Sequence, residues 1–156
     1  MALFLSTFVN KVDKKGRVSV PAPFRTALTG QSFGGIVVFR SYKFPAIEAC
    51  GGDRMERLSS SVDDLALFSE QQDDLAATIF ADARQLAFDS DGRVVLPEEL
   101  ASHANITDRA AFVGRGPTFQ IWEPKAFEIY QEQARERVHR QGATLRLRPP
   151  VPKAEE

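Results

Sequence analysis

The stretch Val12-Asp-Lys-Lys-Gly-Arg-Val-Ser-Val-Pro-Ala-Pro-Phe24 is the most informative part of the chain about its fold, because it recurs as Phe88-Asp-Ser-Asp-Gly-Arg-Val-Val-Leu-Pro-Glu-Glu-Leu100. Aligned without a gap, the two copies are identical at five of thirteen positions, and three further positions are apolar in both. The identical pairs are Asp13 and Asp89, Gly16 and Gly92, Arg17 and Arg93, Val18 and Val94, and Pro21 and Pro97. An internal repeat of this kind indicates that one supersecondary unit is used twice.

Each copy predicts a strand, a tight turn, a second strand and a short helix. Asp favours the first position of a turn and Gly allows positive φ, so residues 13–16 and 89–92 are expected to be turns, with Asp13, Gly16, Asp89 and Gly92 as the turn-forming residues. Residues 6–12 and 17–20 have the composition and alternation of half-buried strands. Proline ends the second strand, and helices are predicted over residues 24–28 and 98–103.

The sequence after each helix predicts a β-hairpin. Apolar runs occur at residues 36–39 and 46–49 in the first copy, and at 111–113 and 119–122 in the second. Between the copies, residues 53–86 have apolar spacings typical of helices, with a break expected at 59–61. Another helix is predicted to begin at Pro124 and to end at Gly142, followed by a disordered tail from residue 144.

The charge of the chain is unevenly distributed. The formal net charge is −1, yet residues 11–25 contain five cations and one anion, and residues 48–74 contain eight acids and two arginines. A basic face kept apart from an acidic body suits a protein that presents one surface to phosphates. The alternative is that both segments are ordinary solvated faces.

The sequence offers no catalytic or metal-binding constellation. His103 and His139 are far apart, and Cys50 is the only cysteine, so neither a nucleophile–base pair nor a thiolate metal site is predicted. No signal peptide or membrane span is apparent. We therefore expect a cytoplasmic protein that is not an enzyme and has no cofactor, metal or membrane partner.

The repeated arginine suggests nucleic-acid binding. Arginine can form two parallel hydrogen bonds to phosphate or to the guanine edge, and Arg17 is accompanied by Lys14 and Lys15, which would attract phosphates. Arg93 is the corresponding residue of the second copy. The alternative is an architectural role, in which the arginine is only the solvent-exposed first residue of the next strand.

These two Asp-x-x-x-Arg motifs, each followed by Val-x-apolar-Pro, resemble the MraZ family of bacterial transcriptional regulators of the division and cell-wall gene cluster. The resemblance extends from about residue 4 to residue 130. It implies an α+β fold of two tandem swapped-hairpin modules of the SpoVT/AbrB type, each a β-barrel, with peripheral helices. It also implies a homo-oligomeric ring, nucleoid association, repression, and cooperative binding to short repeats in the cluster's own promoter, with Arg17, Arg93 and Lys15 reaching double-stranded DNA.

The domain organisation expected on this basis has four parts. The modules are residues 7–54 and 83–126, with a helical spacer at 55–82 and a C-terminal helix and tail at 127–156. Asp91 stands where the first copy has Lys15, so the second copy is expected to contribute less to DNA binding, unless its turn faces away from DNA altogether. Two other functions remain open: a non-catalytic oligomeric scaffold whose acidic helices bind a protein partner, and an enzyme on a related barrel fold.

Overall fold

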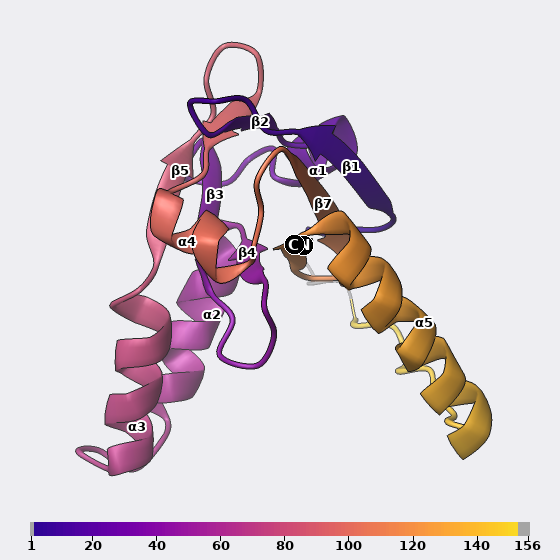
Figure 1. The fold of residues 1–156 in the computed structure, drawn as a ribbon. Coiled ribbons are helices and arrows are strands. Elements are labelled where there is room, and N and C mark those ends of the chain that lie inside the picture. The colour runs from indigo at the N-terminus through magenta and orange to yellow at the C-terminus, as the bar shows by residue number, and fades with distance from the viewer. Residues whose placement is uncertain (1, 153–156) are drawn as a thin grey trace.

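A computed structural model describes residues 2–152 of the chain and shows the same order of elements twice (Figure 1). The first repeat comprises β1 (Thr7–Lys11), β2 (Arg17–Ser19), α1 (Ala22–Ala27), β3 (Gly35–Arg40), β4 (Ile47–Cys50) and α2 (Gly52–Asp63). The second comprises β5 (Arg84–Ala87), β6 (Arg93–Val95), α4 (Glu98–His103), β7 (Arg109–Gly114), β8 (Phe119–Trp122) and α5 (Pro124–Gln141). Helix α3 (Glu70–Leu75) and a π-helical turn (Ala76–Phe80) connect them. The structural repeat therefore includes a final helix that the sequence alignment does not reveal.

The first strand of each repeat pairs with the hairpin of the other repeat. β1 lies antiparallel to β7, with Thr7 opposite Val113, and β5 lies antiparallel to β3, with Gly35 opposite Ala87. The hairpins β3–β4 and β7–β8 meet where β4 pairs with β8, which gives one six-stranded sheet in the order β1-β7-β8-β4-β3-β5. β2 and β6 form a separate two-stranded ribbon. The prediction of an α+β fold with swapped hairpins is confirmed.

The resemblance implies β-barrel modules, and the six-stranded sheet of this chain is open rather than closed. β1 and β5 are its edges, and the ribbon of β2 and β6 is not part of its ladder. The exact boundaries proposed for the modules remain a prediction.

Both repeats contribute to one hydrophobic core. Phe4, Phe24 and Phe119 pack against one another with ring centroids 4.9–5.3 Å apart, and all three are buried. The inner side chains of the ribbon, Val18 and Val94, are equally buried in this core. A second cluster forms beneath α5 from buried or half-buried residues of four segments: Phe44, Ala46, Ala111, Val113, Trp122, Phe127 and Tyr130.

The helical connection differs from the sequence prediction in two places. The serines at 59–61 lie inside α2, where Ser60 Oγ donates a hydrogen bond to the carbonyl oxygen of Glu56, so they do not break the helix. The break comes after Asp63, and Ser69 caps α3 by accepting from the backbone N–H of Gln72. Residues 84–87, predicted as the end of a helix, form β5 because the edge of β3 offers them hydrogen-bond partners.

The predicted bounds of the C-terminal helix are confirmed, and the disorder expected after it stays a prediction. α5 begins at Pro124 as expected, and Gly142 ends it with φ of +59°. Residues 144–152 contain no helix or strand and are exposed, and the last four residues of the expected tail, 153–156, lie outside the described residues. Within residues 2–152, no helix combines the length and apolar character needed to cross a membrane.

Candidate nucleic-acid interface

The two turns predicted to bind DNA lie at one end of the molecule. Figure 1 shows both of them, the indigo turn of residues 13–16 and the pink turn of residues 89–92, opposite the free ends of α3 and α5. The ribbon of β2 and β6 connects them, with Arg17 paired to Val95 and Arg93 paired to Ser19. Sequence-distant segments are therefore brought to one surface.

The first turn holds Arg17 through the carboxylate of Asp13. Oδ1 of Asp13 accepts hydrogen bonds from the backbone N–H groups of Lys15 (2.9 Å) and Arg17 (2.8 Å), and Oδ2 accepts from Arg17 Nε at 2.6 Å. The backbone hydrogen bond from Arg17 is the largest cause of a pKa of Asp13 below its usual range. Gly16 closes the turn at φ of +83°. An ionised Asp13 thus organises the turn and orients the guanidinium.

The second turn repeats this arrangement. Asp89 Oδ1 accepts from the backbone N–H groups of Asp91 and Arg93, both at 2.9 Å, and Oδ2 accepts from Arg93 Nε at 2.9 Å. The pKa of Asp89 is lowered, again mainly by the backbone hydrogen bond from the arginine, and Gly92 has φ of +74°. Part of the role of each arginine is therefore architectural, because its backbone N–H and its Nε both bind the aspartate that begins the turn.

The two arginines differ in what their terminal nitrogens meet. Arg93 Nη2 lies 3.3 Å from a carboxylate oxygen of Asp91, so this guanidinium is shared between two acids. In the described part of the chain, no hydrogen bond or ion pair engages Nη1 or Nη2 of Arg17. Lys14 and Lys15 beside it are exposed. Among their own residues, the first turn therefore has Lys14, Lys15 and an arginine paired with one acid, whereas the second has an arginine paired with two.

Each turn rests on the repeat to which it does not belong. The backbone N–H of Leu96 donates to Gly16 O at 2.9 Å, and the N–H of Val20 donates to Gly92 O at 3.1 Å. At the same end lies Arg25 of α1, whose Nη1 donates to the main-chain oxygen of Asp91 at 3.3 Å. Sequence reasoning did not single out Arg25 as a site residue, because a contact across 66 residues leaves no local pattern.

The acidic segment lies away from the turns. Most of its acids are on α2 and α3, which project from the opposite end of the molecule in Figure 1. The exposed acids of α2 and α3, together with the residue that caps the end of α2, are Asp53, Glu56, Asp63, Asp64, Glu70, Asp73 and Asp74. Phosphates approaching the turns would therefore meet little repulsion from these acids, because exposed charges beyond about 10 Å are largely screened at ordinary salt concentration.

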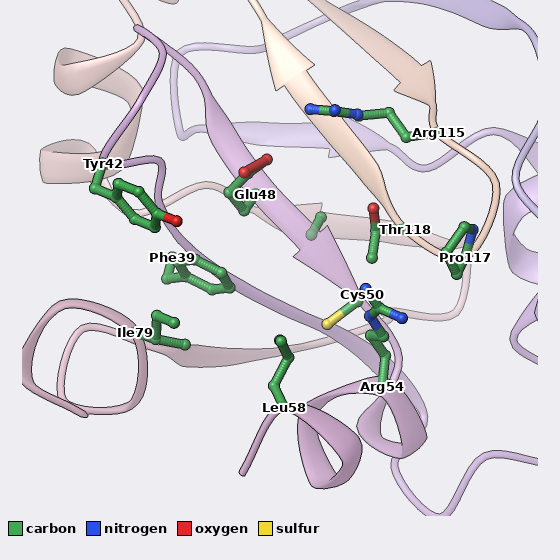
Figure 2. A pocket seen from close by; sticks show the side chains of 11 residues that line it. Phe39, Tyr42, Glu48, Cys50, Arg54, Leu58, Ile79, Arg115, Pro117 and Thr118 are labelled. Carbon is green, nitrogen blue, oxygen red and sulfur yellow. The ribbon is translucent and has the colours of Figure 1, made fainter. Parts of the chain in front are cut away.

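A hollow of about 350 Å³ lies between the sheet and α2 (Figure 2). Burial raises the pKa of the Cys50 thiol in its wall to about 12, so this group is not a thiolate at neutral pH. Glu48, in the same wall, accepts a 2.5 Å hydrogen bond from Gln120 Nε2.

Among residues 2–152, no group of three or more His, Cys, Asp or Glu side chains could hold a metal ion. His103 is half-buried, with Nε2 3.2 Å from the main-chain oxygen of Phe44.

The interleaved repeats and their paired arginine turns define an α+β protein in which the two repeats exchange their first strands. Relatives about 45% identical over nearly the whole chain show that it belongs to the MraZ family. A family model described as "MraZ protein, putative antitoxin-like" matches residues 79–148, which include the second repeat and α5.

Relatives named transcriptional regulator MraZ match nearly the whole chain. The protein of Pelagibacter ubique (strain HTCC1062) is 46% identical over 144 residues, which cover 92% of this chain and 93% of that protein. The protein of Rickettsia akari (strain Hartford) is 45% identical over 146 residues, covering 94% of this chain and 98% of its own. The family resemblance expected from the sequence is therefore confirmed, and a transcriptional regulator is not a class of enzyme.

Proposed function

We propose that this chain is a sequence-specific, DNA-binding transcriptional repressor that acts on the promoter of the division and cell-wall gene cluster, its own gene included. The observation that carries the proposal is the first turn. There Asp13 holds the guanidinium of Arg17 through Nε, no hydrogen bond among the described residues engages its terminal nitrogens, and the neighbouring Lys14 and Lys15 are exposed. A guanidinium held in this way loses little conformational freedom when it binds.

The chemistry of the first turn suits a DNA duplex. The two terminal nitrogens of Arg17 can donate together to O6 and N7 of guanine or to a phosphate, and Lys14 and Lys15 can bind flanking phosphates. Arg93 would make a further contact, weakened by its ion pair with Asp91. No cofactor or metal is needed for such binding.

We further propose that several copies act together as a ring on short promoter repeats in the nucleoid of the cytoplasm. This part of the proposal rests on the family resemblance. One turn offers only a few contacts, but linked copies bind successive repeats at a high effective concentration, so modest contacts add up to tight occupancy.

A second candidate function is a scaffold that binds a protein through the acidic helices. The observation that favours it is the connection between α2 and α3, where Leu67 and Phe68 are 68% and 91% exposed among acidic side chains. Phe68 also has φ of +63°, which is unusual for a bulky residue. Binding of promoter DNA by the wild-type chain at low salt would favour the regulator, and its absence would favour the scaffold.

The test of the main proposal is Arg17→Ala. Loss of a guanine contact costs about 1–3 kcal/mol per subunit, or roughly 5- to 150-fold, and co-operating subunits enlarge the effect. The measurement is a titration at fixed salt against a duplex containing the region upstream of the chain's own gene. Arg57→Ala on α2 is the matched control and should bind like the wild type. The oligomeric state of Arg17→Ala should be that of the wild type. Equal affinities of the Arg17→Ala and wild-type proteins for the duplex would contradict the assignment.

A further inference from the structure

The side chain of Arg25 joins the first repeat to the turn of the second. Arg25 belongs to the last turn of α1 and is half-buried. Its Nη1 donates to the main-chain oxygen of Asp91 at 3.3 Å, and its guanidinium fills the space where a Cβ on residue 92 would lie, with Cζ 2.6 Å from that position. The guanidinium can lie against this turn because residue 92 is glycine.

This interaction has no counterpart at the first turn. With the offset of 76 that relates the two copies, the residue equivalent to Arg25 is Ala101. A Cβ on Gly16 would meet Leu96 O at 3.1 Å and Val95 Cγ1 at 3.6 Å, and no cationic side chain lies among its three nearest atoms. The extra cation is therefore found at the turn in which an acid replaces Lys15.

The charge of Arg25 is available for an incoming anion. Its hydrogen bond goes to a neutral carbonyl of Asp91, whereas the carboxylate of Asp91 pairs with Arg93. Among residues 2–152, no hydrogen bond or ion pair occupies Nε or Nη2 of Arg25. A planar guanidinium with free N–H groups is well suited to bind a phosphate by two hydrogen bonds.

We propose that Arg25 is a phosphate-binding residue of the second turn, supplying from the first repeat a cation that the second repeat's own sequence lacks there. The inference rests on the proposed binding of DNA. It assigns the two turns different sources of charge: Lys14 and Lys15 at the first, and Arg25 across the repeat boundary at the second. The competing role is structural, in which Arg25 only braces the backbone of residues 91 and 92.

The experiment compares Arg25→Gln, Arg25→Lys and the wild-type full-length protein on the same upstream duplex. Gln removes the charge and keeps a side chain able to hydrogen-bond, and Lys keeps the charge without the planar fork. Arg57→Gln is the matched control, since it makes the same change in net charge on α2. Affinity is measured over a series of salt concentrations, and thermal stability is measured for each variant.

Each bound phosphate contributes about 0.9 to the slope of log affinity against log salt. We expect Arg25→Gln to lower this slope by about 0.9 for each engaged second turn, and Arg25→Lys to restore most of it. Arg57→Gln should leave it unchanged. The slope should be lower for Arg25→Gln than for Arg25→Lys even if the two variants lower the melting temperature equally. A purely bracing role would not produce this difference between the slopes.

Two outcomes separate the inference from the proposed function. A wild-type slope for Arg25→Gln, together with weaker binding by Arg17→Ala, would overturn the role of Arg25 and leave DNA binding in place. If Arg25→Gln and Arg25→Lys reduce the slope equally, in proportion to their loss of stability, the phosphate-binding role of Arg25 would be overturned in favour of the bracing role. Failure of the wild-type protein to bind the duplex even at low salt would instead overturn the proposed function.

Discussion

At the first turn, individual residues have separate physical tasks. The carboxylate of Asp13 accepts three hydrogen bonds, and Gly16 adopts a left-handed conformation. The guanidinium of Arg17 is held by one of its three nitrogens. The sequence predicted this division for Asp13 and Gly16, because turn chemistry is local. It could not predict that Asp91 pairs with Arg93 Nη2, since that depends on side-chain positions in the folded turn.

The first residue-scale prediction concerns Gly16→Val. A side chain at φ of +83° is strained, and a Cβ would lie 3.1 Å from Leu96 O, so we expect a loss of at least about 1–2 kcal/mol in unfolding free energy, together with weaker DNA binding. Gly34→Val is the matched control, because a Cβ there meets nothing within 4 Å and Gly34 has no positive φ. Denaturant titration measures the unfolding free energy of both variants, and titration of the upstream duplex measures their DNA binding. Equal midpoints for Gly16→Val and the wild type would show that the turn tolerates a side chain.

At the scale of elements, the central feature is the exchange of strands. β1 and β5 have the lengths and patterns of ordinary strands, and nothing in either segment states which hairpin it will join. The pairing of β1 with β7 and of β5 with β3 places each turn on the opposite repeat, where backbone hydrogen bonds from Leu96 and Val20 support it. The turns are thus built by both repeats together.

The element-scale prediction concerns the two halves of the chain. Residues 1–82 contain β1, β3 and β4 but not β7, β5 and β8, the strands of the second repeat that pair with them, so unpaired strand edges and half of the shared core would be exposed. We expect no folded monomer from residues 1–82, and any folded material to be a dimer in which each copy completes the other. Sedimentation equilibrium with circular dichroism measures this. A cooperatively folding monomer would show that the exchange is dispensable.

At the scale of the whole molecule, charge is arranged along one direction. The cationic turns occupy one end, and the acidic helices α2 and α3 extend from the other (Figure 1). The near-zero net charge of −1 conceals this polarity. Such an arrangement favours approach of a phosphate backbone from one side, as the proposed binding of DNA requires.

The whole-molecule prediction compares Lys15→Ala with Asp91→Lys. Lys15→Ala removes an exposed cation from the first turn and should flatten the salt dependence by about 0.9 for each phosphate that is no longer bound. Asp91→Lys adds a cation and also frees Arg93 Nη2 from its ion pair, so it should steepen the salt dependence and tighten binding to an unrelated duplex. Affinities over a salt series check both. A wild-type slope for Asp91→Lys would mean that the second turn does not approach the phosphates.

The amino-acid sequence was sufficient to predict the repeat, the turns, the α+β class and the family, because these depend on local conformational preferences and on residues within one short segment. It did not predict the open sheet, the continuous α2 or the strand at residues 84–87, which depend on partners that only the folded chain provides. Folding in three dimensions placed both turns at one end, paired Asp91 with Arg93, and laid Arg25 on Gly92. The physical reason is that hydrogen bonds and ion pairs form between atoms close in space, and strand exchange makes neighbours of residues far apart in the chain.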